Sequence, residues 1–272
     1  MSHSVMKISF VGSGNVAWHL TQAFEEAGHW ICEVYSRDIN NARALAGILY
    51  DTDVLTSLNF SESEAELIVI AVSDDALPSV MEQIVLPENV IVANTSGTKS
   101  LADLQNLLDI YSDVNVHAGI FYPLQTFSRN VPLDYQDLPF CIESRNAEVE
   151  TTLVNLARTI SSNVHKLNSY QRFVLHVGAV FASNFTNHLL SISHDLVTRE
   201  GLDFDLLKPL IQATIEKALQ ADDPAPGQTG PARRGDWDIT TRHLEYLEEI
   251  NTSWAEIYDL LTEKIVARHN VK

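Results

Sequence analysis

Cysteine is scarce in this chain of 272 residues: only Cys32 and Cys141 are present, and each lies inside an apolar run. The cysteines form no closely spaced pair, and the histidines contain no His-x-x-x-His spacing. The sequence therefore lacks both a disulfide framework and a typical zinc motif. We expect two buried thiols in a reducing compartment and no metal site.

Positive charge is also in short supply. The chain has 18 Lys and Arg against 36 Asp and Glu, so its formal net charge is −18, which opposes binding to nucleic acid or to an anionic membrane. Long hydrophobic runs are missing too: the longest strongly apolar stretch, LIVIAV, is too short to span a bilayer. The first residues, MSHSVMK, have no apolar segment or cleavage site, so we predict a soluble, cytoplasmic protein.

Short apolar runs alternate with amphipathic segments through the first part of the chain. This alternation predicts an α/β domain with a doubly wound, mostly parallel sheet. The predicted strands are 7–11, 30–36, 67–72, 89–95, 114–118 and 140–144, and the predicted helices are 15–28, 39–47, a segment from Ser73 or Asp74 to about Val85, and 100–108.

The pattern changes near residue 169. Helical periodicity covers 169–200, 205–220, 239–250 and 252–268, and the segment 221–236, dense in Pro and Gly, is predicted to be non-helical. We therefore predict a Rossmann domain at 1–168 and an all-α domain at 169–272, with 163–167 either a last strand or a linker.

The motif VGSGNVA, residues 11–17, follows the first predicted strand and opens the first predicted helix. Gly12 allows a tight turn, Gly14 lets the backbone approach a pyrophosphate, and Ala17 replaces the third glycine of the dinucleotide fingerprint. The helix N-terminus then offers free N–H groups to the phosphates. The sequence therefore predicts a dinucleotide site.

The end of the second strand predicts which dinucleotide binds. NAD enzymes usually have an acidic residue there, whereas this chain has Ser36 and Arg37, which suit a 2′-phosphate. NADP(H) is therefore the predicted cofactor, although Arg37 could also be a plain surface residue. The predicted cofactor-binding residues are Gly12, Ser13, Gly14, Asn15 and Val16, then Ser36 and Arg37, and then Ala71, Val72 and Ser73 at the end of the third predicted strand.

Several motifs resemble a known family. FVGSGNVAWHL, VYSRD, AVSDDAL, HAGIFYPLQTFS, HVGAVFASNFTNHL and TGPARRGD are similar to those of Rossmann-like NADP oxidoreductases that carry a C-terminal domain of unknown function. More distantly, the layout resembles pyrroline-carboxylate reductases, ketopantoate reductases and β-hydroxyacid dehydrogenases. The resemblance implies a reductase or dehydrogenase that forms a homodimer through its helical domain.

One departure concerns the proton donor. β-Hydroxyacid dehydrogenases carry a catalytic lysine on the long helix after the Rossmann domain, but no lysine occurs here between Lys166 and Lys208. His176 and Asn184 occupy that helix instead, on one stripe. We predict that His176 exchanges a proton with the substrate and that Asn184 orients it or the substrate, the alternative being a buried structural histidine.

The remaining candidates are substrate-binding residues. His117 is predicted to end a strand on the ligand side, with Tyr122 in the loop beyond it, and both could instead be packing residues. Arg234 could bind a substrate carboxylate, and Asp236 could anchor that arginine or cap the next helix. Ser96 follows the fourth predicted strand and could hold a carboxylate or the nicotinamide ribose.

Two functions fit this pattern. The first is an NADP-dependent oxidoreductase acting on a small, carboxylate-bearing keto, hydroxy or imine substrate. The second is an NADP-binding sensor or scaffold without turnover, which the missing helix lysine favours.

Overall fold

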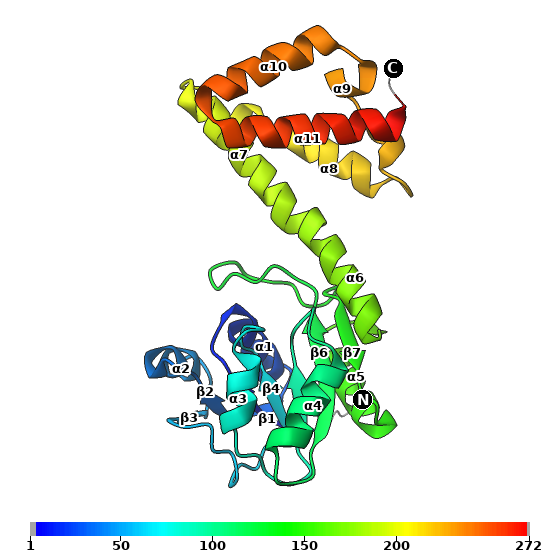
Figure 1. The fold of residues 1–272 in the computed structure, drawn as a ribbon. Helices are drawn as coiled ribbons and strands as arrows, with labels where there is room; N and C mark the ends of the chain where they lie inside the picture. Colours follow the sequence, from blue (N-terminus) through cyan, green and yellow to red (C-terminus); the bar gives the residue numbers. More distant parts are fainter. Residues whose placement is uncertain (1–3, 271–272) are drawn as a thin grey trace. The chain divides into compact units, whose positions relative to one another are not determined.

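The structure is a computed structural model that describes residues 4–270. Its core is an eight-stranded sheet with the order β3-β2-β1-β4-β5-β6-β7-β8 (Figure 1). Strands β1 to β6 run parallel, and β7 and β8 run the other way. The strands are β1 Lys7–Val11, β2 Trp30–Tyr35, β3 Asp53–Leu55, β4 Leu67–Ile70, β5 Ile91–Asn94, β6 His117–Pro123, β7 Phe140–Glu143 and β8 Val164–Lys166.

Helices cover both faces of the sheet, because successive side chains of a strand point to opposite faces. In β4, Leu67 and Val69 join the cluster under α1, α2 and α5, whereas Ile68 and Ile70 join the cluster under α3 and α4. The doubly wound fold class is therefore confirmed. The helices are α1 Asn15–Glu26, α2 Ile39–Ala46, α3 Leu77–Gln83, α4 Leu101–Tyr111 and α5 Ala147–Arg158.

The structure corrects one local prediction, adds two elements and decides between two alternatives. Helix α3 begins after Ala76 without a side-chain cap, so the predicted cap at Ser73 or Asp74 is wrong; the Asp74 carboxylate accepts the Thr98 hydroxyl instead. The short edge strand β3 and helix α5 are additional elements. The segment 163–167 contains the last strand, β8, and is not a linker.

The rest of the chain is helical. The predicted helix over 169–200 is confirmed as α6 Ser169–Ala179, the π-helix η1 Val180–Phe185 and α7 Thr186–Arg199. The predicted non-helical segment 221–236 contains two short helical turns, η3 Ala225–Gly227 and α9 Pro231–Arg234. The remaining elements are η2 Phe204–Leu206, α8 Lys208–Leu219, α10 Trp237–Ile250 and α11 Thr252–His269. Across residues 4–270, no helix combines the length and apolar character that crossing a bilayer requires.

The chain divides into two compact units, 1–183 and 184–272. Helix α6 lies in the first unit, where its one buried residue, Arg172, binds it to the sheet. Arg172 is fully buried, pairs with the Glu143 carboxylate and donates to the Lys99 carbonyl at 2.5 Å. Ser169 donates to the same carboxylate at 2.8 Å. The predicted boundary between the Rossmann domain and the all-α domain at residue 168 stays a prediction.

Candidate functional site

The loop between β1 and α1 lies at the carboxyl edge of the sheet, where open α/β folds bind ligands. Gly12 has a φ of +111°, which disfavours any residue with a side chain. Its N–H donates to the Tyr35 carbonyl at 2.8 Å. A Cβ at this position would lie 2.2 Å from the Ala71 carbonyl oxygen. Gly12 is therefore required by the packing of β1 against its neighbours.

Gly14 is a glycine for a different reason. It precedes the first turn of α1 with an ordinary φ of −71°, and a Cβ built there meets no atom within 4 Å. No internal packing in the described chain explains the glycine, so the space before the α1 N-terminus is open. An anion held by backbone N–H groups fits this space, which is consistent with the predicted pyrophosphate position.

The end of β2 carries polar groups beside this loop. Ser13 donates its hydroxyl to the Ser36 hydroxyl at 2.8 Å. Asp38 caps α2 by accepting the Asn40 N–H at 2.9 Å, so its carboxylate serves the helix. Arg37 is exposed and forms no ion pair with the described residues. The Arg37 cation and the two serine hydroxyls suit a phosphate group, because the nearest carboxylate, that of Asp38, is occupied by the helix cap.

The structure joins two candidates that the sequence could name only separately. The Tyr122 hydroxyl, in β6, and Nδ1 of His176, in α6, lie 3.0 Å apart. Their rings meet edge to face, with centroids 6.0 Å apart. Burial raises the pKa of Tyr122 to about 12. The phenol therefore stays protonated at neutral pH and can donate a hydrogen bond to the imidazole.

The loop after β5 closes one side of this pair. A Cβ on Gly97 would lie 2.5 Å from Nδ1 of His176 and 2.9 Å from Cζ of Tyr122, so the glycine makes room for both rings. Ser96 uses its hydroxyl to accept the N–H groups of Thr98 at 3.0 Å and Lys99 at 2.9 Å. Its hydroxyl therefore holds the turn, and its proposed contact with substrate stays a prediction.

The other cofactor candidates lie where parallel strands end. Ala71, Val72 and Ser73 follow β4 directly, and the Ala71 N–H donates to the Val11 carbonyl at 2.8 Å. Asn15 donates its side-chain amide to the Phe127 carbonyl at 2.8 Å. The amide of Asn15 is thus occupied, whereas Val16 lies in the first turn of α1, where backbone N–H groups have no partner within the helix.

The predicted position of His117 is wrong. His117 is the first residue of β6 and pairs with Ile91, the first residue of the parallel strand β5. It therefore lies at the amino edge of the sheet, opposite the edge that carries Gly12 and Gly14. The strand begins there because its register follows β5, whereas the apolar run VNVHA suggested that a strand ended there. Tyr122, predicted to lie in the loop, is inside β6.

Asn184, Arg234 and Asp236 belong to the second unit. Arg234 donates from Nε to the Asp236 carboxylate at 2.9 Å, and Nη2 lies 2.7 Å from the same oxygen. Asp236 precedes α10 but makes no side-chain cap, so its carboxylate anchors the arginine. Asn184 is exposed within η1. Convergence of these residues with His176 stays a prediction.

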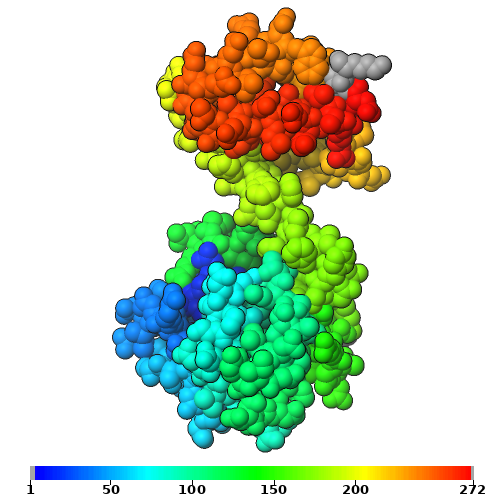
Figure 2. Space-filling view, in the orientation of Figure 1, coloured from blue at the N-terminus to red at the C-terminus, as the bar shows by residue number. Residues whose placement is uncertain are grey.

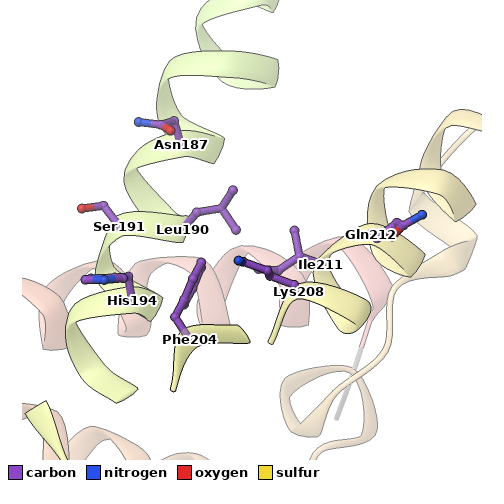
Figure 3. Close-up of a pocket in the computed structure, with 8 residues that line it drawn as sticks. All are labelled: Asn187, Leu190, Ser191, His194, Phe204, Lys208, Ile211 and Gln212. Atoms are coloured by element: carbon purple, nitrogen blue, oxygen red, sulfur yellow. The ribbon is translucent and has the colours of Figure 1, made fainter. Parts of the chain in front are cut away.

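A separate cavity of about 550 Å³ lies in the second unit (Figure 3). Its cation, Lys208, pairs with Asp205, and the His194 ring packs edge-on against Phe204 at 5.3 Å between centroids. The cavity contains none of the predicted site residues, and its lysine is already paired. Its lining residues are Asn187, Leu190, Ser191, His194, Phe204, Lys208, Ile211 and Gln212.

Sequence reasoning missed three polar residues near the site. Arg172 holds α6, and with it His176, against the sheet. His19 in α1 contacts the Ser128 carbonyl in the segment between β6 and β7. Arg129 in that segment contacts the Ser13 carbonyl and the Trp18 ring of α1. In sequence each resembles an ordinary helix or loop residue, because the partners that give them a role lie far away in the chain.

Comparisons with known proteins agree with this architecture. Residues 1–111 match a Rossmann-like domain, and residues 138–265 match a domain of unknown function, DUF2520. The structure of a putative NADP oxidoreductase from Bacteroides fragilis is 32% identical, with a TM-score of 0.86 over 98% of each chain.

More distant structures share the fold alone. A reductive aminase from Aspergillus terreus in complex with NADPH and ethyl levulinate is 13% identical, with a TM-score of 0.69 over 97% of this chain and 95% of that chain. A 1-pyrroline-5-carboxylate reductase from Streptococcus pyogenes is 10% identical, with a TM-score of 0.61 over 97% of this chain and 98% of that chain. No curated protein matches. The family resemblance drawn from the motifs is confirmed: the chain belongs to the family of Rossmann-like proteins that carry a DUF2520 domain.

Proposed function

We propose that this chain is an NADP(H)-dependent oxidoreductase that transfers a hydride between the cofactor and a small, carboxylate-bearing keto, hydroxy or imine substrate. The reaction class and the cofactor agree with the name of the Bacteroides fragilis relative. The carrying observation is the Tyr122–His176 hydrogen bond, formed at the same sheet edge as the open space before Gly14.

The cofactor would be held by groups already described. Backbone N–H groups of residues 12–16 suit the pyrophosphate, and Ser36 and Arg37 suit a 2′-phosphate. Bound NADPH supplies the hydride, and Ala71, Val72 and Ser73 border the nicotinamide side of the sheet edge.

His176 carries the proton in this proposal. Because Tyr122 remains protonated at neutral pH, it donates to Nδ1, and the proton of the neutral imidazole then resides on Nε2. We assign Nε2 as the atom that delivers this proton to the substrate oxygen or nitrogen as negative charge develops there, while Nδ1 takes up the hydroxyl proton of Tyr122 so that the ring stays neutral. The Tyr122 phenolate then regains a proton from solvent, so Tyr122 both fixes the tautomer and replaces the proton that the imidazole gives up.

The substrate carboxylate is assigned to Arg234. Asp236 engages the guanidinium through Nε and Nη2, which fixes its plane for bidentate binding of a second anion. Asn184 is the proposed hydrogen-bonding partner of the substrate. This assignment rests on the chemistry of the residues.

Replacing Arg37 with alanine should weaken NADPH binding by about tenfold to a hundredfold, the value of a charge-assisted phosphate contact. NADH affinity should hardly change, because NADH has no 2′-phosphate. Titration of both nucleotides by intrinsic fluorescence measures this, with Arg43→Ala in α2 as a matched loss of charge. Equal affinity of the native protein for the two nucleotides would remove the role assigned to Arg37.

Turnover separates the two candidate functions. The native protein should oxidise NADPH in the presence of some member of a panel of small keto acids and cyclic imines. A protein that binds NADPH tightly but turns over none of them would fit the sensor or scaffold reading, which the lack of a lysine between Lys166 and Lys208 favours.

We also propose that the second unit forms a homodimer and that the protein works in the cytoplasm. Helix α8 has no buried residue, and its Leu210 and Leu219 are 65% and 81% exposed. Exposed apolar side chains on this helix favour a partner surface, and a second copy of this chain supplies one.

Light scattering after size exclusion should therefore report about twice the 30.3 kDa of one chain. Leu210→Glu should shift this mass to that of a monomer, because a charge at an apolar interface is costly to bury. Tyr50→Glu, at a 94% exposed position of the first unit, is the control and should leave the mass unchanged. A monomeric native protein would contradict the proposal.

A further inference from the structure

The segment that joins β6 to β7, residues 124–139, is fastened onto α1; we name it the β6–β7 loop. Its anchor is His19, which is 5% exposed. Nε2 of His19 lies 2.9 Å from the Ser128 carbonyl, and Nδ1 lies 2.9 Å from the Tyr135 hydroxyl. Burial raises the pKa of Tyr135 to about 12, so its hydroxyl remains a donor. The Tyr135 hydroxyl also donates to the His19 carbonyl at 3.1 Å, so three contacts join the β6–β7 loop to His19.

This anchoring places the loop against the phosphate-binding segment. In Figure 2 the loop, in green, borders the dark-blue N-terminal residues. The Phe127 carbonyl accepts the Asn15 amide at 2.8 Å, and Arg129 donates from Nη2 to the Ser13 carbonyl. The loop thus contacts the residues on either side of Gly14.

Arg129 is a cation without an acidic partner. No carboxylate within residues 4–270 pairs with it, although the chain carries a net charge of −18. Its guanidinium lies 4.9 Å from the centroid of the Trp18 ring, which holds the plane of the group by a cation–π contact. The Trp18 contact therefore fixes the position of the Arg129 guanidinium but does not neutralise its charge.

We propose that Arg129 binds the pyrophosphate of the dinucleotide, an inference that rests on the proposed function. The segment 11–17 contains no basic side chain, so this segment offers only N–H groups and the helix dipole to two negative phosphates. Arg129 supplies the missing positive charge from a distant part of the sequence. Its donors beyond the Ser13 contact suit phosphate oxygens.

A pyrophosphate contact differs from a 2′-phosphate contact in one measurable way, because NADPH and NADH share the pyrophosphate. Arg129→Met keeps an unbranched side chain over Trp18 but removes the charge. It should weaken NADPH and NADH by the same factor, about tenfold to a hundredfold. Inorganic pyrophosphate, used as a competitor, should also lose affinity. Arg129→Lys should restore part of the binding, whereas Arg37→Ala should weaken NADPH alone.

A purely structural role for Arg129 would give another pattern. Tyr135→Phe removes a hydroxyl that fastens the loop but leaves the cation, and it should cost much less affinity than Arg129→Met. Equal losses in these two variants, or unchanged nucleotide affinity in Arg129→Met, would overturn the inference. A native protein that binds neither nucleotide would instead refute the proposed function, so the two failures are distinguishable.

Discussion

Replacing His176 with alanine should lower turnover by about 10²- to 10⁴-fold, the usual contribution of a positioned general acid, while NADPH affinity stays as in the native protein. The reason is the separation of tasks at the sheet edge. The cofactor contacts assigned above come from the loops after β1, β2, β4 and β6, and His176 comes from α6. Steady-state rates on the substrate found by screening, together with nucleotide titration, measure both quantities.

The matched variant is Tyr122→Phe, which removes the hydroxyl 3.0 Å from Nδ1 and leaves the ring in the core. It should lower turnover by about tenfold, because the imidazole keeps its donor but loses the bond that fixes its tautomer. Added imidazole should restore part of the activity of His176→Ala. Undiminished turnover in His176→Ala, or a loss that imidazole cannot relieve, would remove His176 as the proton donor.

Local features of the site were predictable from the sequence, because their causes are local. The turn at Gly12 and the open position at Gly14 follow from a strand, a glycine pair and a helix that are consecutive in the chain. Likewise Arg37 follows directly from where β2 ends. The alternation of strands and helices along the chain is also encoded locally, since each apolar run is followed by an amphipathic one.

Features that depend on register or on distant partners were not predictable in the same way. His117 was placed at the wrong edge because the start of β6 is set by pairing with β5, which periodicity does not reveal. Strand β3 is a three-residue edge strand with no fully buried side chain, so it leaves little hydrophobic signal. Its existence depends on pairing with β2.

The same limit applies to the polar contacts of the site. Tyr122 and His176 were named as separate candidates, and only the packing of α6 on the sheet makes them a pair. That packing depends on Arg172, whose charge suggests a solvated helix face although its side chain is fully buried against Glu143. Arg129 gains its position from His19, which lies on another element.

Gly14→Asp should abolish cofactor binding while keeping the fold, with a loss of NADPH affinity of about a hundredfold or more. Gly14 is the N-cap of α1, has an extended backbone and makes no side-chain cap. Aspartate is among the best residues at such a position, because its carboxylate accepts N–H groups of the first turn. It would therefore occupy the donors assigned to the pyrophosphate and repel its charge.

Gly14→Asp should change folding stability and NADPH affinity in opposite directions, which distinguishes it from a variant that loses affinity because it is destabilised. The melting temperature of Gly14→Asp should equal or exceed that of the native protein, since a Cβ at this position meets no atom within 4 Å and the new cap adds a few tenths of a kcal/mol, roughly. Gly14→Asn caps the helix equally well without the charge, so it should bind NADPH better than Gly14→Asp but worse than the native protein. Thermal unfolding and nucleotide titration on the three proteins test this. Undiminished NADPH binding in Gly14→Asp would mean that the α1 N-terminus does not hold the pyrophosphate, because no dianion should tolerate a carboxylate on the donors that bind it.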